Sequence, residues 1–97
     1  MVGDRAALFN LNSDFHFEIY AASQNAILCQ LIEGLWDRST VYRRRFTFMP
    51  DRAAQALAEH RQILESCRRR DANDASEAVR RNVKATTIAI TDSVRLM

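Results

Sequence analysis

Apolar residues recur at intervals of three and four along most of the chain, which predicts amphipathic α-helices. The first segment, about residues 4–22, starts near Asp4, which we expect to be its N-cap or an acid of its first turn. Its apolar positions are Leu8, Leu11, Phe15, Ile19 and Ala22. Asn12 and His16 lie four residues apart and therefore on adjacent turns at the edge of this stripe. Polar side chains that face inward need partners, so this pair makes the segment a candidate for function.

The same spacing predicts three further helices. The second runs from about residue 25, after the turn-forming Ser23-Gln24-Asn25, to about residue 45. The third begins at Pro50 or Asp51 and ends within residues 68–70. The fourth follows the N-cap Asp71. The inward positions are Ile27, Leu28, Leu31, Ile32, Leu35, Trp36 and Tyr42 in the second; Ala53, Ala56, Leu57, His60, Ile63, Leu64 and Cys67 in the third; and Ala75, Ala78, Val79, Asn82, Thr86, Ala89, Ile90, Ser93 and Val94 in the fourth.

The pattern predicts an all-α fold, an antiparallel bundle of about four helices with short connections. Two glycines and one proline in 97 residues argue against a sheet with tight hairpins. We expect residues 1–97 to form one domain, since this length is typical of a single core.

Polar residues interrupt the apolar face of three predicted helices. His60 lies on the centre line of the third, and Asn82 occupies a position in the fourth that the pattern assigns to an apolar residue. If the helices share one core, Asn12, His16, His60 and Asn82 converge on one pocket. Imidazole nitrogens bind zinc or nickel well and amide oxygens bind them weakly. Arg38, near the apolar face of the second helix, has the forked guanidinium that binds a carboxylate.

The alternative is that these polar groups are buried and hydrogen-bonded to one another or to water. Spacing alone favours this alternative, because two histidines separated by 44 residues (60 minus 16) match no recognised metal motif. The sequence by itself therefore leaves both interpretations open.

Charge and composition argue against several classes of function. Fourteen basic and twelve acidic residues give a net charge of +2, so we interpret the arginine clusters at 43–45, 68–70 and 80–81 as solvated helix ends rather than a nucleic-acid interface. The sequence has no evident catalytic triad or carboxylate pair, so we expect no enzyme. It also lacks a secretion signal or a membrane-spanning run. We expect Cys29 and Cys67 to be reduced core thiols in a cytoplasmic protein.

Four segments carry a family resemblance: GDRAALFNLNSDFHFEIYAASQNAIL; LWDR with its arginine-rich continuation; PDR; and LAEHRQILESCRRRDANDASEAVRRN. Together they resemble the C-terminal effector-binding domain of FadR-type regulators in the GntR superfamily, the FCD domain. In that family an Asp or Asn precedes a Phe-His pair by one turn, and an Ala-Ser-Gly-Asn loop follows. A Glu-His pair opens the next signature, and an Arg-Asp leads into the last helix.

The resemblance implies a metal site on Asn12, His16, His60 and Asn82. The family has a third histidine at the last position, so Asn82 is a departure. Two imidazoles and two neutral amides supply no charge to a divalent ion, so we expect weaker metal binding than in other members. Alternatively, these residues bind a small organic acid together with Arg38 and without a metal.

The family also carries an N-terminal winged helix-turn-helix domain and further helices of the effector domain, neither of which is in this sequence. We therefore expect a truncated regulator that binds no DNA by itself, exposes apolar surface and forms a homodimer. The expected function is an effector-sensing and dimerisation domain of a transcription regulator. The competing hypothesis is a helical remnant that serves only for dimerisation or interaction and binds no ligand.

Overall fold

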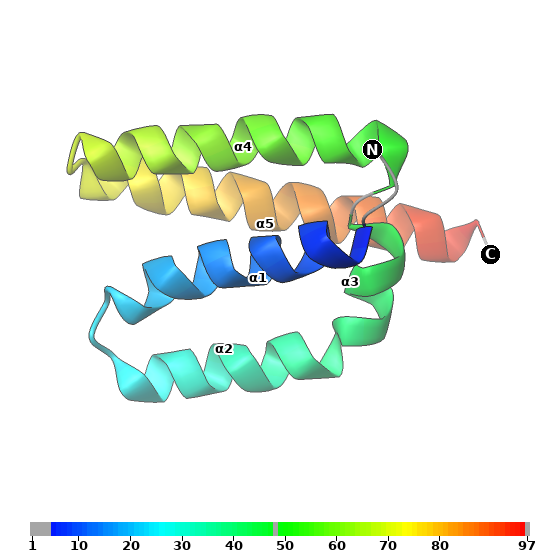
Figure 1. The fold of residues 1–97 in the computed structure, drawn as a ribbon, viewed down its shortest axis with the longest axis horizontal. Helices are drawn as coiled ribbons and strands as arrows, with labels where there is room; N and C mark the ends of the chain where they lie inside the picture. The colour runs from blue at the N-terminus through cyan, green and yellow to red at the C-terminus, as the bar shows by residue number, and fades with distance from the viewer. Residues whose placement is uncertain (1–4, 48, 97) are drawn as a thin grey trace. The chain divides into compact units, whose positions relative to one another are not determined.

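A computed structural model describes residues 5–47 and 49–96 of the chain (Figure 1). These residues form five helices and no strand: α1 Arg5–Ala21, α2 Ala26–Arg38, α3 Thr40–Phe46, α4 Pro50–Arg68 and α5 Ala72–Arg95. The all-α prediction is confirmed, with five helices in place of about four. The predicted N-cap Asp4 lies outside the described residues. None of the described helices is long and apolar enough to span a membrane.

The chain divides into two compact units between Arg45 and Phe46. The N-terminal unit holds α1, α2 and most of α3, and the C-terminal unit holds α4 and α5. Each unit is described by itself below.

The single helix predicted for residues 25–45 is divided into α2 and α3 at Ser39. The carbonyl of Trp36 accepts hydrogen bonds from the hydroxyls of Ser39 (3.1 Å) and Thr40 (3.1 Å) and from Nη2 of Arg43 (2.7 Å). Hydroxyl side chains that bond to the preceding turn compete with the helical ladder. The Ser39-Thr40 pair therefore interrupts the helix although the apolar spacing continues through it.

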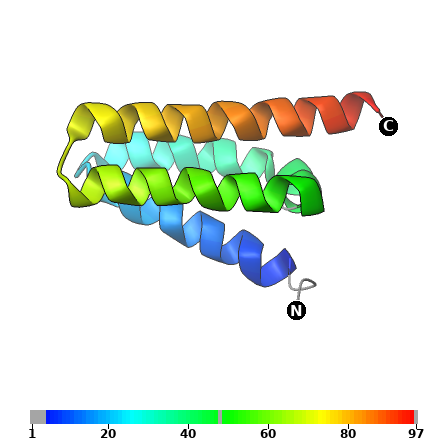
Figure 2. The same cartoon turned by 90° about the horizontal axis from the view of Figure 1, so that it is seen from above.

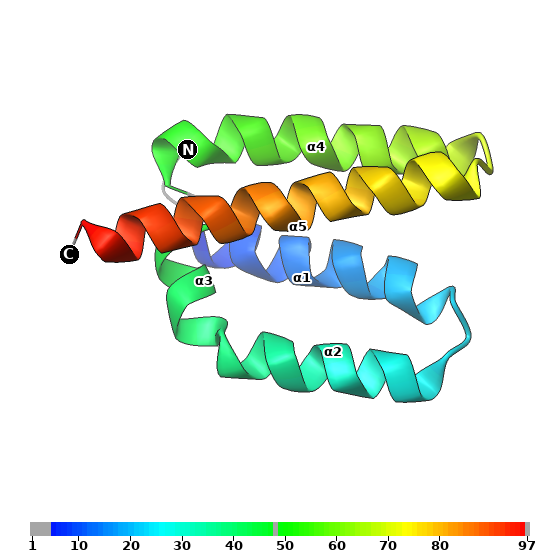
Figure 3. The same ribbon diagram turned by 180° about the vertical axis from the view of Figure 1, so that it is seen from behind.

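In the C-terminal unit, α4 and α5 form an antiparallel hairpin, and the C-terminal end of α5 extends past the start of α4 (Figures 2 and 3). Asp71 is the N-cap of α5, as predicted, and its carboxylate accepts a hydrogen bond from the amide of Asp74 at 3.0 Å. Ile63 is fully buried, and Ala56 and Ala78 are 2% exposed. Small side chains such as these two alanines permit close packing of neighbouring helices.

The buried face of α4 is rotated from the predicted face by about one residue. Arg52, Ala56, Ile63 and Ser66 are buried, whereas Leu57 is 51% exposed, Leu64 is 58% exposed and Cys67 is exposed. The prediction of Cys67 as a core thiol is therefore wrong, and His60 is half-buried rather than central. The reason is that α4 buries small and hydrogen-bonded polar residues, which a pattern based on large apolar side chains misses.

In the N-terminal unit, α1 packs against α2, which has no buried residue among those described. Leu28 is 44% exposed, Leu31 63% and Leu35 65%, so the apolar face of α2 is largely uncovered. This exposure agrees with the expectation of uncovered apolar surface. Cys29 is half-buried, and its thiol donates to the carbonyl of Tyr20 at 3.2 Å. Both cysteines are free thiols.

Candidate functional site

Asn12 and His16 lie on adjacent turns of α1, and both are buried, at 9% and 3% exposure. Their predicted inward placement is therefore confirmed. The ring centroid of His16 lies 5.6 Å from Trp36 and 6.0 Å from Tyr20. His16 thus forms part of an aromatic cluster between α1 and α2, in which burial also raises the pKa of Tyr20.

Trp36 is the centre of this cluster and the only tryptophan of the chain. Phe17 meets it edge-to-face at a centroid distance of 5.1 Å. Arg43 of α3 also contacts the cluster. Its guanidinium carbon lies 4.1 Å from the centroid of the Trp36 ring and 5.1 Å from the centroid of the Phe9 ring. Trp36 is therefore in contact both with His16, a predicted pocket residue, and with Arg43, a cation.

Arg43 is only 8% exposed, yet none of the ion pairs formed by the described residues includes it. Its Nε donates to the Ser39 hydroxyl at 3.0 Å, and its Nη2 donates to the Trp36 carbonyl. Burial lowers the pKa of Arg43 to about 10, with Asp37 opposing the shift and Arg44 adding to it. The side chain is therefore still a cation at neutral pH.

Arg38, the arginine predicted to hold a carboxylate, is the last residue of α2 and is exposed. Its side chain makes no hydrogen bond or ion pair within the described part of the chain. The sequence analysis did not identify Arg43, the buried cation of this unit.

In the C-terminal unit, His60 and Asn82 lie beside a buried ion pair. Arg52 donates from Nη1 and Nη2 to the two carboxylate oxygens of Glu59, at 2.9 and 2.6 Å. Asn82, 2% exposed, donates from Nδ2 to Glu59 Oε1 at 2.7 Å, and Thr86 accepts from Arg52 at 3.0 Å. This Arg52–Glu59–Asn82–Thr86 network joins α4 to α5.

Two groups in and beside this network have shifted pKa values. Burial raises the pKa of Glu59, but the hydrogen bonds from Arg52 and Asn82 outweigh it and hold the pKa below its usual 4.5. Burial lowers the pKa of His60 below 6.5, against the opposing charge of Glu59. His60 is therefore neutral at pH 7, the form in which an imidazole can act as a ligand.

The side chains of the predicted metal site are weak ligands for a divalent ion. Because a carboxylate only accepts hydrogen bonds, the Asn82 amide turns its nitrogen to Glu59 and leaves Oδ1 as its one remaining ligand atom. No group of three or more His, Cys, Asp or Glu side chains suited to a metal occurs among residues 5–47 and 49–96. The predicted set contains only two such side chains, so a divalent ion would be held by neutral ligands alone.

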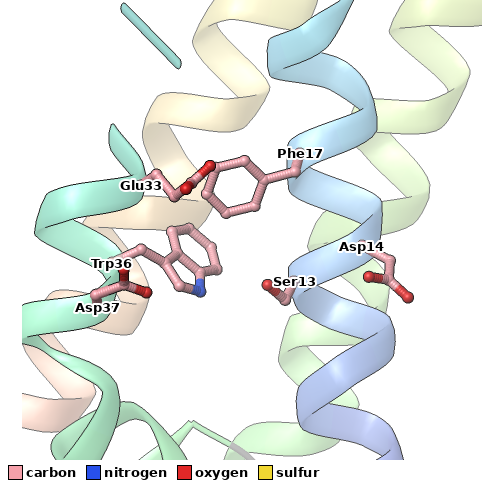
Figure 4. A pocket seen from close by; sticks show the side chains of 6 residues that line it. All are labelled: Ser13, Asp14, Phe17, Glu33, Trp36 and Asp37. Carbon is pink, nitrogen blue, oxygen red and sulfur yellow. The ribbon is translucent and has the colours of Figure 1, made fainter. Parts of the chain in front are cut away.

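A cavity of about 270 Å³ opens between α1 and α2 (Figure 4). It is lined by Ser13, Asp14, Phe17, Glu33, Trp36 and Asp37. In Figure 4, Phe17 and Trp36 point toward each other across the space between the helices. Three carboxylates repel an anion, so this cavity does not suit an organic acid.

Arginines in two of the arginine-rich segments pair with nearby acids. Arg68 donates to Glu65 at 2.6 Å, and Arg69 to Asp74 at 2.8 Å. Arg80 lies 3.8 Å from Glu77. The contacts of residues 68–70 agree with the interpretation of solvated, charge-balanced helix ends. That interpretation is wrong for Arg80 and Arg81, which are exposed but lie within α5 rather than at its end, and for Arg43, which is buried.

The sequence analysis also did not identify Arg52 and Glu59, the ion pair to which Asn82 is hydrogen-bonded. The available signal was their spacing: they lie seven residues apart on one helix and thus on one face. Arg43 carried a weaker signal, because it sits among three consecutive arginines that all fit a solvated helix end.

Comparison with known families gives one match: the model of the FCD domain matches residues 2–85. No curated protein matches this sequence, and no solved structure matches it.

Proposed function

Because the chain belongs to the FCD domain family, the C-terminal effector-binding domain of GntR-family regulators, we propose that it senses a small organic acid and dimerises. The observation that carries this proposal is the burial of Asn12 and His16 on one face of α1. A buried histidine and amide supply directional hydrogen bonds that an apolar pocket lacks. The proposed pocket residues are these two with Arg38, His60 and Asn82.

In an intact regulator, the acid would favour one arrangement of the dimer and thereby change the placement of the DNA-binding domains. A divalent ion, zinc or nickel, is the second part of the proposal. If bound, it would be held by His16 and His60 with the amides of Asn12 and Asn82 and would attract the carboxylate of the acid. The neutral donor set predicts weak affinity for the ion.

A thermal-shift screen tests the proposal. The panel contains zinc, nickel and five acids (acetate, lactate, malonate, succinate and citrate), with acetamide, malonamide and succinamide as neutral controls. A ligand at one hundred times its Kd stabilises the native state by about 2.7 kcal/mol, which raises the Tm. We expect stabilisation by at least one acid but not by its amide, and loss of this effect in His16→Ala and His60→Ala.

A second candidate function is interaction without a ligand, and the exposed face of α2 favours it. Leu28, Leu31 and Leu35 form an uncovered apolar stripe of the kind that mediates protein contacts. If no acid or metal raises the Tm and the histidine variants leave the screen unchanged, this interaction module is the better description.

A further inference from the structure

Two buried hydrogen-bond donors of the N-terminal unit have no acceptor. Nη1 of Arg43 and Nε1 of Trp36 are both shielded from solvent, and neither has a hydrogen-bond partner within the described part of the chain. The two residues are stacked, with the guanidinium carbon 4.1 Å from the indole centroid. Buried donors are paired in most native structures, and an unpaired one carries a cost in free energy.

The remaining atoms of Arg43 are fixed in place. Nε is bonded to the Ser39 hydroxyl, Nη2 is bonded to the Trp36 carbonyl at 2.7 Å, and the plane is held against the indole. These contacts fix the direction of Nη1. Hydrogen bonds to neutral oxygens do not neutralise the cation, and no carboxylate within the described part of the chain is bonded to it; Asp37 acts on it only through its charge.

We propose that Arg43, with the indole N–H of Trp36, binds the carboxylate of the effector acid. This inference rests on the proposed function and names the cation that receives the acid. A carboxylate offers two oxygens with several acceptor positions, which suits two nearby donors, one of them charged. His16 contacts the same indole, with centroids 5.6 Å apart, so the bound acid would lie close to the buried pocket residues of α1.

The charge distribution locates the acid at the Arg43 end of the cluster. Arg44, whose guanidinium lies 4.6 Å from the Phe9 ring, places a second positive charge beside Arg43. The cavity on the α1–α2 side of Trp36 carries three carboxylates, of which Asp37 also acts on Arg43 through its charge without bonding to it. An anion is therefore favoured beside the arginines and disfavoured in that cavity.

Trp36 itself provides the measurement, because it is the only tryptophan and stacks on Arg43. Its fluorescence is titrated with acetate, lactate, malonate, succinate and citrate at constant ionic strength, and with acetamide, malonamide and succinamide as controls. We expect saturable quenching or enhancement by at least one acid and none by its amide. Arg43→Gln should weaken the apparent Kd at least tenfold, and Arg43→Lys should restore part of the affinity.

Arg45→Gln is the matched control, since it removes the same charge from an exposed arginine two residues away and should change the Kd less than threefold. If an acid binds with equal affinity to Arg43→Gln while His16→Ala abolishes binding, the inference is overturned and the proposed function stands. If no acid binds the wild-type protein, both are overturned.

A spectroscopic measurement on the wild-type chain covers the case in which Arg43→Gln fails to fold. In protein labelled with nitrogen-15 arginine, the Nη protons of Arg43 should shift when the acid is added. Unchanged Nη signals at saturating acid would show that water alone satisfies this donor and would overturn the inference.

Discussion

The two units each bury an arginine, and they stabilise it in different ways. Arg52 of the C-terminal unit is 5% exposed and forms two hydrogen bonds with the carboxylate of Glu59. Arg43 of the N-terminal unit is 8% exposed and contacts aromatic rings, a hydroxyl and a carbonyl, with no carboxylate. Arg52 is therefore bonded to a carboxylate within the fold, whereas Asp37 acts on Arg43 only through its charge.

This difference agrees with the packing of the two hairpins. In the C-terminal unit, small side chains and the Arg52–Glu59–Asn82–Thr86 network join α4 closely to α5. In the N-terminal unit, α2 contributes no buried residue, and Nη1 of Arg43 and Nε1 of Trp36 have no acceptor within the described part of the chain. Nε of Arg52 in the C-terminal unit is likewise without one, so the contrast lies in the carboxylate bonded to Arg52 and in the packing. The difference supports the proposed binding of an anion at Arg43 in the N-terminal unit.

The largest expected effect follows from breaking the buried ion pair. Glu59→Ala leaves Arg52 buried without its partner and removes the acceptor of Asn82, so we expect the free energy of unfolding to fall by about 3 kcal/mol. Urea unfolding followed by circular dichroism measures this loss. The control Glu65→Ala removes an exposed pair with Arg68 and should cost less than about 1 kcal/mol. Equal losses in both variants would contradict the role assigned to the network.

A smaller effect is expected at Arg43. Arg43→Met keeps the apolar contact with Trp36 and removes a buried charge that has no carboxylate partner. The lost hydrogen bonds to Ser39 and Trp36 offset this gain, so we expect a change within about 1 kcal/mol in either direction. Urea unfolding followed by Trp36 fluorescence measures it. A loss as large as that of Glu59→Ala would mean that Arg43 is essential to the fold.

The smallest effect concerns pH and His60. Because its folded pKa lies below 6.5, His60 binds a proton less readily in the native state than in the unfolded chain. Its contribution to stability is therefore present above pH 6.5 and is lost as the pH falls through the lowered pKa. Glu59, whose pKa is also lowered, acts in the same direction below pH 4.5. We expect the Tm to decrease from pH 7.5 to 5.5 and the slope to be smaller in His60→Gln.

The helical fold was predictable because the apolar spacing and the caps act locally. Asp71, Asn25 and Pro50 begin helices within a residue of the expected positions. The break at Ser39 was missed because it depends on hydroxyl bonds to a single carbonyl rather than on apolar spacing. The rotation of the α4 face was missed because the position of its buried face depends on the packing partner and on polar pairs.

The candidate site was predictable in part. The spacing of Asn12 and His16 correctly placed both on a buried face of α1. Burial of Arg43 depends on Trp36 and Phe9, which are seven and 34 residues away, so no local pattern distinguishes it from Arg44 and Arg45. The convergence of Asn12 and His16 with His60 and Asn82 stays a prediction.

Gln24 and Arg70, in the connections before α2 and α5, both have φ of 57°. Residues other than glycine, asparagine and aspartate rarely adopt this left-handed backbone conformation, which costs them roughly 1 kcal/mol. The FCD loop that this segment resembles has glycine where the chain has Gln24. Each hairpin therefore turns through one residue with a mildly strained backbone. Glycine usually lowers the stability of a folded chain, but at positions 24 and 70 it would remove this strain.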